Sequence, residues 1–254
     1  MNIREVIGKF LKEQGYLNDA NIEGVIFYGS YQTNTNTNSS DVDLMIVYND
    51  ESNKESIKGY KSYNGYNFEY FERTLSSLYK RADYDYLHFE DTLYSSIGYA
   101  ELLIDKNQKL KNLQEYVLKK FKNGLPKLSY DDKMNLAKTL HKAMERLNIM
   151  KENSNPYFNI FYGITLEKIR DFYHKLNGFS NISIANVCKL YTNKKLQEAQ
   201  HKSLPEDKFI NLYLNCVNNI DYRNILELYN YSIRDIKDDV DFYNIRLKLG
   251  NRQH

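Results

Sequence analysis

Apolar residues recur at helical spacing along the whole chain, whereas short apolar runs typical of strands occur only in its first part. Residues 3–11 carry apolar side chains at helical spacing, as do residues 75–82 and 92–99. Short apolar runs that predict strands lie at residues 24–28, 42–47, 66–73 and 101–105. Residues 50–61 are a polar stretch with weak helix signals. Residues 1–108 are therefore predicted to form a small α/β domain with a mixed sheet.

After residue 108 only helical patterns are convincing. Predicted helices occupy residues 110–121, 134–147, 156–177, 203–216 and 221–236. Pro156 is expected at the first position of its helix, and Ser203 with Glu206 has the spacing of a capping box. Residues 109–254 are therefore predicted to be an all-helical bundle, and the fold class of the whole chain is α+β.

Composition narrows the class of protein only slightly. The chain has 254 residues, enough for two modest domains, and a net charge of +2, too small for a protein that coats nucleic acid in general. Selective binding of an RNA stays open. Charges run throughout the first fifteen residues, so they do not predict a signal peptide, and no apolar run has the length of a membrane span. A cytoplasmic location without membrane contact is the default expectation.

The candidate chemistry lies between the first two predicted strands. Gly29-Ser30 ends one strand and Asp41-Val42-Asp43 opens the next. Because side chains alternate along a strand, Asp41 and Asp43 are expected on one face, with the apolar residues packed behind them. Two adjacent carboxylates repel each other unless a cation lies between them, and a hard divalent ion such as Mg²⁺ prefers oxygen ligands. Gly29 leaves room for a phosphate near the backbone, and Ser30 offers a hydroxyl and an N–H.

At these residues the sequence resembles the DNA polymerase β-like nucleotidyltransferase superfamily. The shared features are a strand that ends in Gly-Ser, a connection of ten residues (residues 31–40) and an Asp-x-Asp in the next strand. The resemblance implies a nucleotidyltransferase that uses ATP or another nucleoside triphosphate and two Mg²⁺ ions. Asp41 and Asp43 would bind metal, and Gly29 and Ser30 would hold the triphosphate.

The same resemblance implies a third acidic residue on a neighbouring strand. Glu69 is the first choice, as a metal ligand or as the base for the acceptor, and Glu72, on the opposite face of the same predicted strand, is the alternative. An aspartate is more frequent at this place in the family.

The layout, a small α/β domain followed by helices, is similar to that of bacterial aminoglycoside and lincosamide nucleotidyltransferases. That similarity implies transfer of AMP to a hydroxyl of a small molecule in the interdomain cleft, and a role in antibiotic resistance. Glu145 and Glu167 are candidate bases by position, although a solvated helix face explains them more simply.

Two other functions stay open. One is a nucleotidyltransferase that acts on RNA, on a protein or on another nucleotide, as antitoxin-like members and second-messenger synthases do. The other is a nucleotide-binding scaffold without catalysis. The acceptor, the preferred base, the residue that acts as general base and the oligomeric state are not fixed by the sequence.

Overall fold

The computed structural model describes residues 2–236, which form two compact units. The first unit runs to Asn123 and also contains Lys195–Lys202, and the second contains Gly124–Lys194 and the chain from Ser203 onward. The sequence had placed the boundary at residue 108, before helix α5 (Lys109–Phe121). That boundary is too early, because the apolar side of α5 packs in the same core as the sheet.

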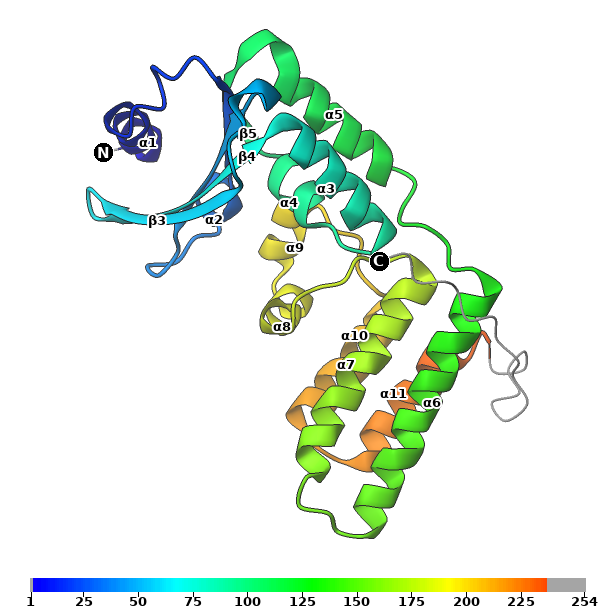
Figure 1. Ribbon diagram of the computed structural model, residues 1–254. Helices are drawn as coiled ribbons and strands as arrows, with labels where there is room; N and C mark the ends of the chain where they lie inside the picture. Colours follow the sequence, from blue (N-terminus) through cyan, green and yellow to red (C-terminus); the bar gives the residue numbers. More distant parts are fainter. Residues whose placement is uncertain (1, 237–254) are drawn as a thin grey trace. The chain divides into compact units, whose positions relative to one another are not determined.

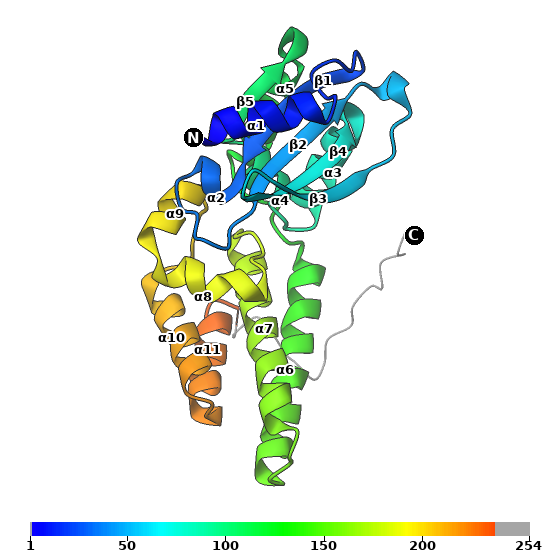
Figure 2. The ribbon, with the colours of Figure 1, turned by 90° about the vertical axis from the view of Figure 1, so that its left-hand side faces the viewer.

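The first unit is built on a mixed sheet, as predicted. Its strands are β1 (Ile22–Tyr28), β2 (Val42–Tyr48), β3 (Ile57–Tyr63), β4 (Tyr66–Thr74) and β5 (Glu101–Asp105). Their order is β3-β4-β2-β1-β5, seen in Figure 2, with β2 and β4 parallel and every other pair antiparallel. The central strand β2 therefore has a neighbour on each side and is buried along almost its whole length.

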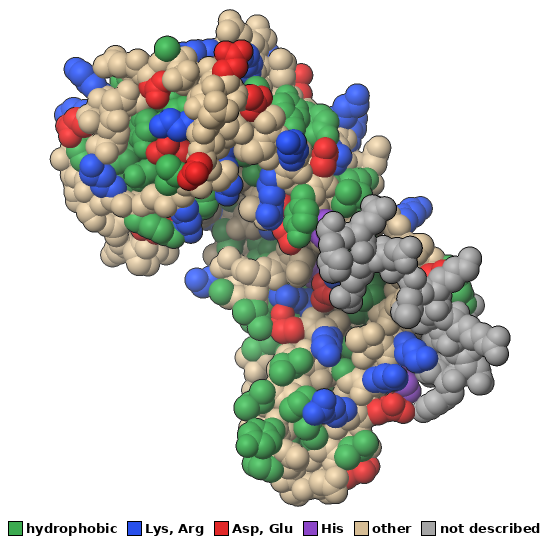
Figure 3. All heavy atoms as spheres, viewed as in Figure 1, with side chains coloured by type: hydrophobic (Ala, Val, Ile, Leu, Met, Phe, Trp, Pro, Cys, Tyr) green, Lys and Arg blue, Asp and Glu red, His purple; other side chains and the backbone are tan. Residues whose placement is uncertain are grey.

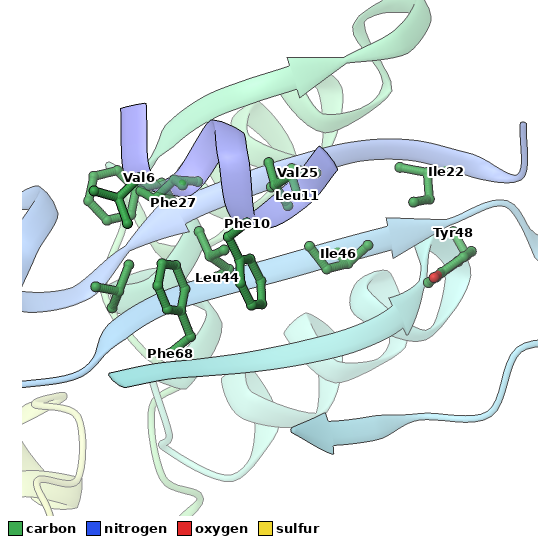
Figure 4. Close-up of a cluster of buried hydrophobic side chains, with 12 residues drawn as sticks. Val6, Phe10, Leu11, Ile22, Val25, Phe27, Leu44, Ile46, Tyr48 and Phe68 are labelled. Carbon is green, nitrogen blue, oxygen red and sulfur yellow. The ribbon is translucent and has the colours of Figure 1, made fainter. Parts of the chain in front are cut away.

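Helices cover both faces of this sheet (Figure 1). Helix α1 (Ile3–Glu13) lies on one face, and α3 (Leu75–Leu87), α4 (Thr92–Ile97) and α5 lie on the other. Alternate residues of β2 enter the two resulting cores. Leu44 and Ile46 pack toward α1, as Figure 4 shows, whereas Met45 and Val47 pack toward α3 and α5.

Strand β3 is the main element that the sequence prediction missed. Residues 50–61 read as a polar stretch with weak helix signals, but only Asp50–Ser52 form a short 3-10 helix, η1, and β3 follows. β3 is an edge strand whose side chains are mostly exposed, so it lacks the apolar alternation of a half-buried strand. The signal that identifies it is Asn64-Gly65, where both residues have positive φ and close a two-residue hairpin to β4.

The second unit is all helical within the described residues. Its helices are α6 (Tyr130–Glu152), α7 (Phe158–Asn177), α8 (Ile184–Thr192), α10 (Asp207–Asn218) and α11 (Tyr222–Ile233). The sequence missed α8. Gly178 ends α7 in the left-handed region, as predicted.

The two predicted helix starts in this unit are wrong. Helix α7 begins at Phe158, after Pro156, with Tyr157 as the N-cap. Helix α10 begins after Glu206, which is its N-cap, so Ser203 lies three residues before the cap position. The Glu206 carboxylate instead accepts hydrogen bonds from Tyr173 Oη and Arg234 Nη2, each at 2.7 Å. Glu206 therefore serves tertiary contacts rather than a capping box.

A late segment of the chain returns to the first unit. Helix α9 (Lys194–Gln200), which the sequence also missed, is followed by His201 and Lys202. The Lys202 Nζ lies 2.9 Å from Asp91 Oδ1, with both side chains nearly buried, and the His201 ring stacks on Tyr99 at 3.8 Å. These contacts hold the returning segment against the region around α4.

Within residues 2–236, none of the helices combines the length and the apolar character that crossing a bilayer requires.

The packing of α1 generates a prediction about stability. Phe10 is fully buried, and its ring stacks on Phe68 with the centroids 4.2 Å apart. Phe10→Ala is expected to lower the free energy of unfolding by about 3–5 kcal/mol, because it removes this contact and leaves a cavity. Urea denaturation measures the change. The exposed Lys12→Ala on the same helix is the control and should change it by less than about 0.5 kcal/mol.

Candidate active site

The end of β1 and the start of β2 bring Gly29 against Asp43. Tyr28 pairs with Asp43 across the two strands, and the chain then turns at Gly29, whose φ is +78°. A Cβ at Gly29 would collide with the Asp43 carboxylate. Position 29 therefore needs glycine both for its backbone conformation and for this close approach. Ser30 follows in the single helical turn α2 (Gly29–Gln32).

The parallel pairing of β2 with β4 sets Asp43 beside Glu69. Asp41 lies immediately before β2, close enough for its negative charge to raise the pKa of Asp43. Glu69 also has a cationic neighbour, because its Oε1 lies 2.6 Å from Nζ of Lys58 on the edge strand β3. The structure thus gathers the three carboxylates that the sequence selected, and adds a lysine that the sequence did not point to.

The raised pKa of Asp43 indicates that this cluster lacks positive charge. Burial raises the pKa of Asp43 to about 7, and the negative charges of Glu69 and Asp41 add to the effect, while Lys58 opposes it. The pKa of Tyr28 is raised as well, by burial first and then by Asp43 and Glu69. A carboxyl whose pKa lies so far above its usual range marks a place where a bound cation would be stabilised.

Glu72, the alternative third carboxylate, lies elsewhere. It points to the opposite face of β4 and is buried, where its Oε1 accepts a hydrogen bond of 2.8 Å from Tyr16 Oη. Burial raises the pKa of Tyr16 and of Tyr48, and the negative charge of Glu72 contributes to both shifts. Glu72 thus belongs to the core beneath α1, and Glu69 is the glutamate beside Asp43.

The chemistry of the carboxylate cluster fits a divalent ion, but its geometry is not that of a finished metal centre. Carboxylate oxygens are the ligands that Mg²⁺ prefers. In residues 2–236, however, no three side chains of the metal-binding types are arranged to hold an ion, and Glu69 contacts Lys58 instead. The residues that would hold a metal are Asp41, Asp43 and Glu69, after Glu69 leaves Lys58.

The candidate bases of the helical unit are engaged in local contacts. Glu167 Oε1 accepts a hydrogen bond of 2.6 Å from Tyr213 Oη, and its Oε2 pairs with Arg170 Nη2 at 2.6 Å. Glu145 lies 3.5 Å from His141 Nε2. These contacts explain both glutamates structurally, and their role as bases stays a prediction.

Comparison with known proteins agrees with this geometry. A family model described as "Polymerase beta, Nucleotidyltransferase" matches residues 11–123. This part of the chain is a nucleotidyltransferase domain of the polymerase beta type. The match ends where the first continuous stretch of the compact unit ends, and it includes Gly29, Ser30 and all three carboxylates.

One solved structure shows a distant likeness to the whole chain. It is a nucleotidyltransferase-like protein from Exiguobacterium sibiricum 255-15, with 10% sequence identity and a TM-score of 0.47. The likeness covers 94% of this chain and 81% of that one. Among curated proteins, none matches the chain at a significant level.

The raised pKa of Asp43 predicts how the stability of the nucleotidyltransferase domain depends on pH. The folded protein holds the Asp43 proton up to about pH 7, whereas the ordinary pKa of an aspartate, expected in the unfolded chain, is 3.8. Between these values folding takes up a proton, so the contribution of Asp43 to stability falls as pH rises and is constant above pH 7. Asp43→Asn has no such loss. Without metal, the variant should therefore gain about 2–3 kcal/mol of stability relative to wild type between pH 5 and pH 8.

Urea denaturation of both proteins in excess chelator, at each pH, measures this difference. The titrating groups that do not interact with position 43 are the same in both proteins, so their contributions cancel, and the difference reports the acidic cluster. A constant difference between the two proteins at pH 5 and pH 8 would contradict the proposed electrostatic origin.

Proposed function

We propose that this protein transfers a nucleoside monophosphate, with ATP as the default donor, to a hydroxyl of a small molecule of the aminoglycoside type. The acceptor oxygen forms a bond to the α-phosphorus, the bond from that phosphorus to the bridging oxygen breaks, and pyrophosphate leaves. The single observation that supports this proposal most is the pairing of Asp43 with Glu69 beside Gly29 in a polymerase-β-type domain.

The residues of the cluster have distinct roles in this proposal. Asp41 and Asp43 would hold Mg²⁺, two ions being expected, and Glu69 would complete the set or accept the proton of the acceptor hydroxyl. When bound, such ions lower the pKa of the attacking hydroxyl and neutralise charge on the leaving phosphates. Gly29 and Ser30 would lie against the β- and γ-phosphates. Lys58, once Glu69 has left it, would be a cation available to the phosphate oxygens.

Beyond the stabilisation of charge, catalysis of phosphoryl transfer depends mostly on holding the donor and the acceptor in the right geometry. The cluster is well suited to it, because Asp43 projects from a strand buried between two cores and Gly29 restricts its carboxylate from the other side. Because Asp43 is held in place and Glu69 is partly exposed, only the Glu69 side chain would need to move when an ion binds, and the sheet would stay unchanged.

The proposal predicts which substitutions abolish transfer. Asp41→Asn, Asp43→Asn and Glu69→Gln should each lower the rate by at least about a hundredfold, because each removes charge that would hold the metal. Glu72→Gln, on the same strand but the opposite face, is the matched control and should retain activity with reduced stability. The assay follows α-labelled nucleoside triphosphates with Mg²⁺, and circular dichroism checks the fold of each variant.

The acceptor is identified by offering several classes in the same assay. Aminoglycosides, lincosamides, tRNA and lysate proteins are each incubated with each labelled nucleotide. Label on a small molecule in wild type alone supports the proposal, whereas label on RNA or protein moves the activity to the macromolecular alternative. If no label moves but a nucleotide binds, the protein is the scaffold alternative and the proposal is wrong. If no nucleotide binds either, both the proposal and the scaffold alternative are wrong.

A further inference from the structure

The helical unit contains a cavity that is open to the surface and whose lining residues all belong to that unit. It has a volume of about 650 Å³ and lies between α7 and the segment that leads into α8. Its lining combines isoleucines with charged and amide side chains. A volume of this size is within the range of small-molecule sites, in which an apolar surface carries a few polar groups. The carboxylates of the candidate active site take no part in it.

Gly163 leaves space on the cavity side of α7. It lies inside a helix of 20 residues, where glycine is less stable than alanine by about 1 kcal/mol. A Cβ placed on Gly163 meets no atom within 4 Å, so no packing contact demands glycine here. The missing side chain instead keeps this part of the cavity open.

Apolar side chains beside the cavity are exposed to an unusual degree. Ile160 and Ile164 on α7 and Ile184 at the start of α8 line the cavity with 61%, 47% and 67% of their surfaces exposed. Figure 3 shows apolar side chains at the surface of the helical unit. Covering these three isoleucines would remove apolar area from water, which favours a ligand with an apolar body.

Arg170 supplies polar groups to the same cavity. Its side chain is 6% exposed, and its Nη2 pairs with Glu167 Oε2 at 2.6 Å and lies 3.5 Å from Asn181 Oδ1. Its Nε and Nη1 are buried and have no hydrogen-bond partner among residues 2–236. Leaving a buried donor unsatisfied costs about 1–3 kcal/mol, so an acceptor that gained these nitrogens through a small movement of the Arg170 side chain toward the cavity would bind favourably.

The charge of the lining indicates the sign of that acceptor. The two carboxylates of the lining are compensated, because Glu167 pairs with Arg170 and Asp171 pairs with Lys175 at 2.8 Å. Lys168 also lines the cavity, is exposed, and makes no ion pair with any residue from 2 to 236. The four charged lining residues sum to zero, and Lys175 beside Asp171 brings the local sum to +1, so the exposed Lys168 is the group that favours an anion.

We propose that this cavity binds a small amphipathic carboxylate. Its apolar body would lie over Gly163 against the three isoleucines, and its carboxylate would meet Arg170 and Lys168. A planar carboxylate suits the guanidinium of arginine, whose N–H groups form a fixed fork. The site is independent of nucleotide transfer, since neither Asp43 nor Glu69 contributes to it.

Hexanoate is the probe that tests this proposal, with 1-hexanol as an uncharged molecule of the same chain length. The full-length protein, labelled at the isoleucine δ1 methyl groups, is titrated with each compound into the millimolar range and followed by NMR. With hexanoate the methyls of Ile160, Ile164 and Ile184 should shift in a saturable way, whereas those of Ile26 and Ile46 in the sheet should not. Hexanol should bind about tenfold more weakly, because it lacks the charge-assisted hydrogen bonds.

Gly163→Leu is the variant that blocks the cavity without disturbing its polar groups. Leucine favours a helix more than glycine does and meets open space there, so the fold should be retained while hexanoate binding is lost. Gly8→Leu is the matched control, because Gly8 is also a helical glycine with open space around it, in the first unit, and it should bind as wild type does. Unchanged methyl signals in wild type, equal binding of hexanol, or full binding by Gly163→Leu would each overturn the proposal.

Discussion

The contact on which the candidate active site depends is the one between Asp43 and Glu69 on parallel strands. Two carboxylates side by side repel, and burial of Asp43 strengthens that repulsion. The register that creates the contact is held from both sides, because Leu44 and Ile46 are fixed in one core and Met45 and Val47 in the other. A slip of one residue would turn every one of these side chains to the wrong face. Apolar packing thus maintains an arrangement of charges that is unfavourable by itself.

Alternation along a strand also separates chemistry from structure on β4. Glu69 and Glu72 are three residues apart, and an odd separation places them on opposite faces. Glu69 faces the acidic cluster and Lys58, whereas Glu72 is enclosed with Tyr16 and Tyr48 under α1. Two residues of the same type therefore differ completely in what they can do, and the difference is set by the pleat of the sheet.

The sequence predicted the parts of the fold that have a strong local signal. The four strands with apolar runs and the end of the first strand at Gly29-Ser30 are of this kind. β3 was missed because an exposed edge strand has no apolar alternation, although Asn64-Gly65 marked its turn. The early domain boundary has another cause: α5 looks like any amphipathic helix, and only tertiary packing shows which core it joins. The pairing of Lys58 with Glu69 could not be foreseen, since it depends on the register of β3 against β4.

The return of Lys195–Lys202 to the first unit makes that unit discontinuous in sequence. The ion pair of Lys202 with Asp91 and the stacking of His201 on Tyr99 connect residues more than a hundred positions apart. A fragment that stops at residue 123 would keep the acidic cluster but leave Asp91 without its lysine and expose the surface that the returning segment covers. Truncation at the end of the family match is therefore not equivalent to isolating a domain, and the helical bundle is connected to its neighbour by several crossings of the chain.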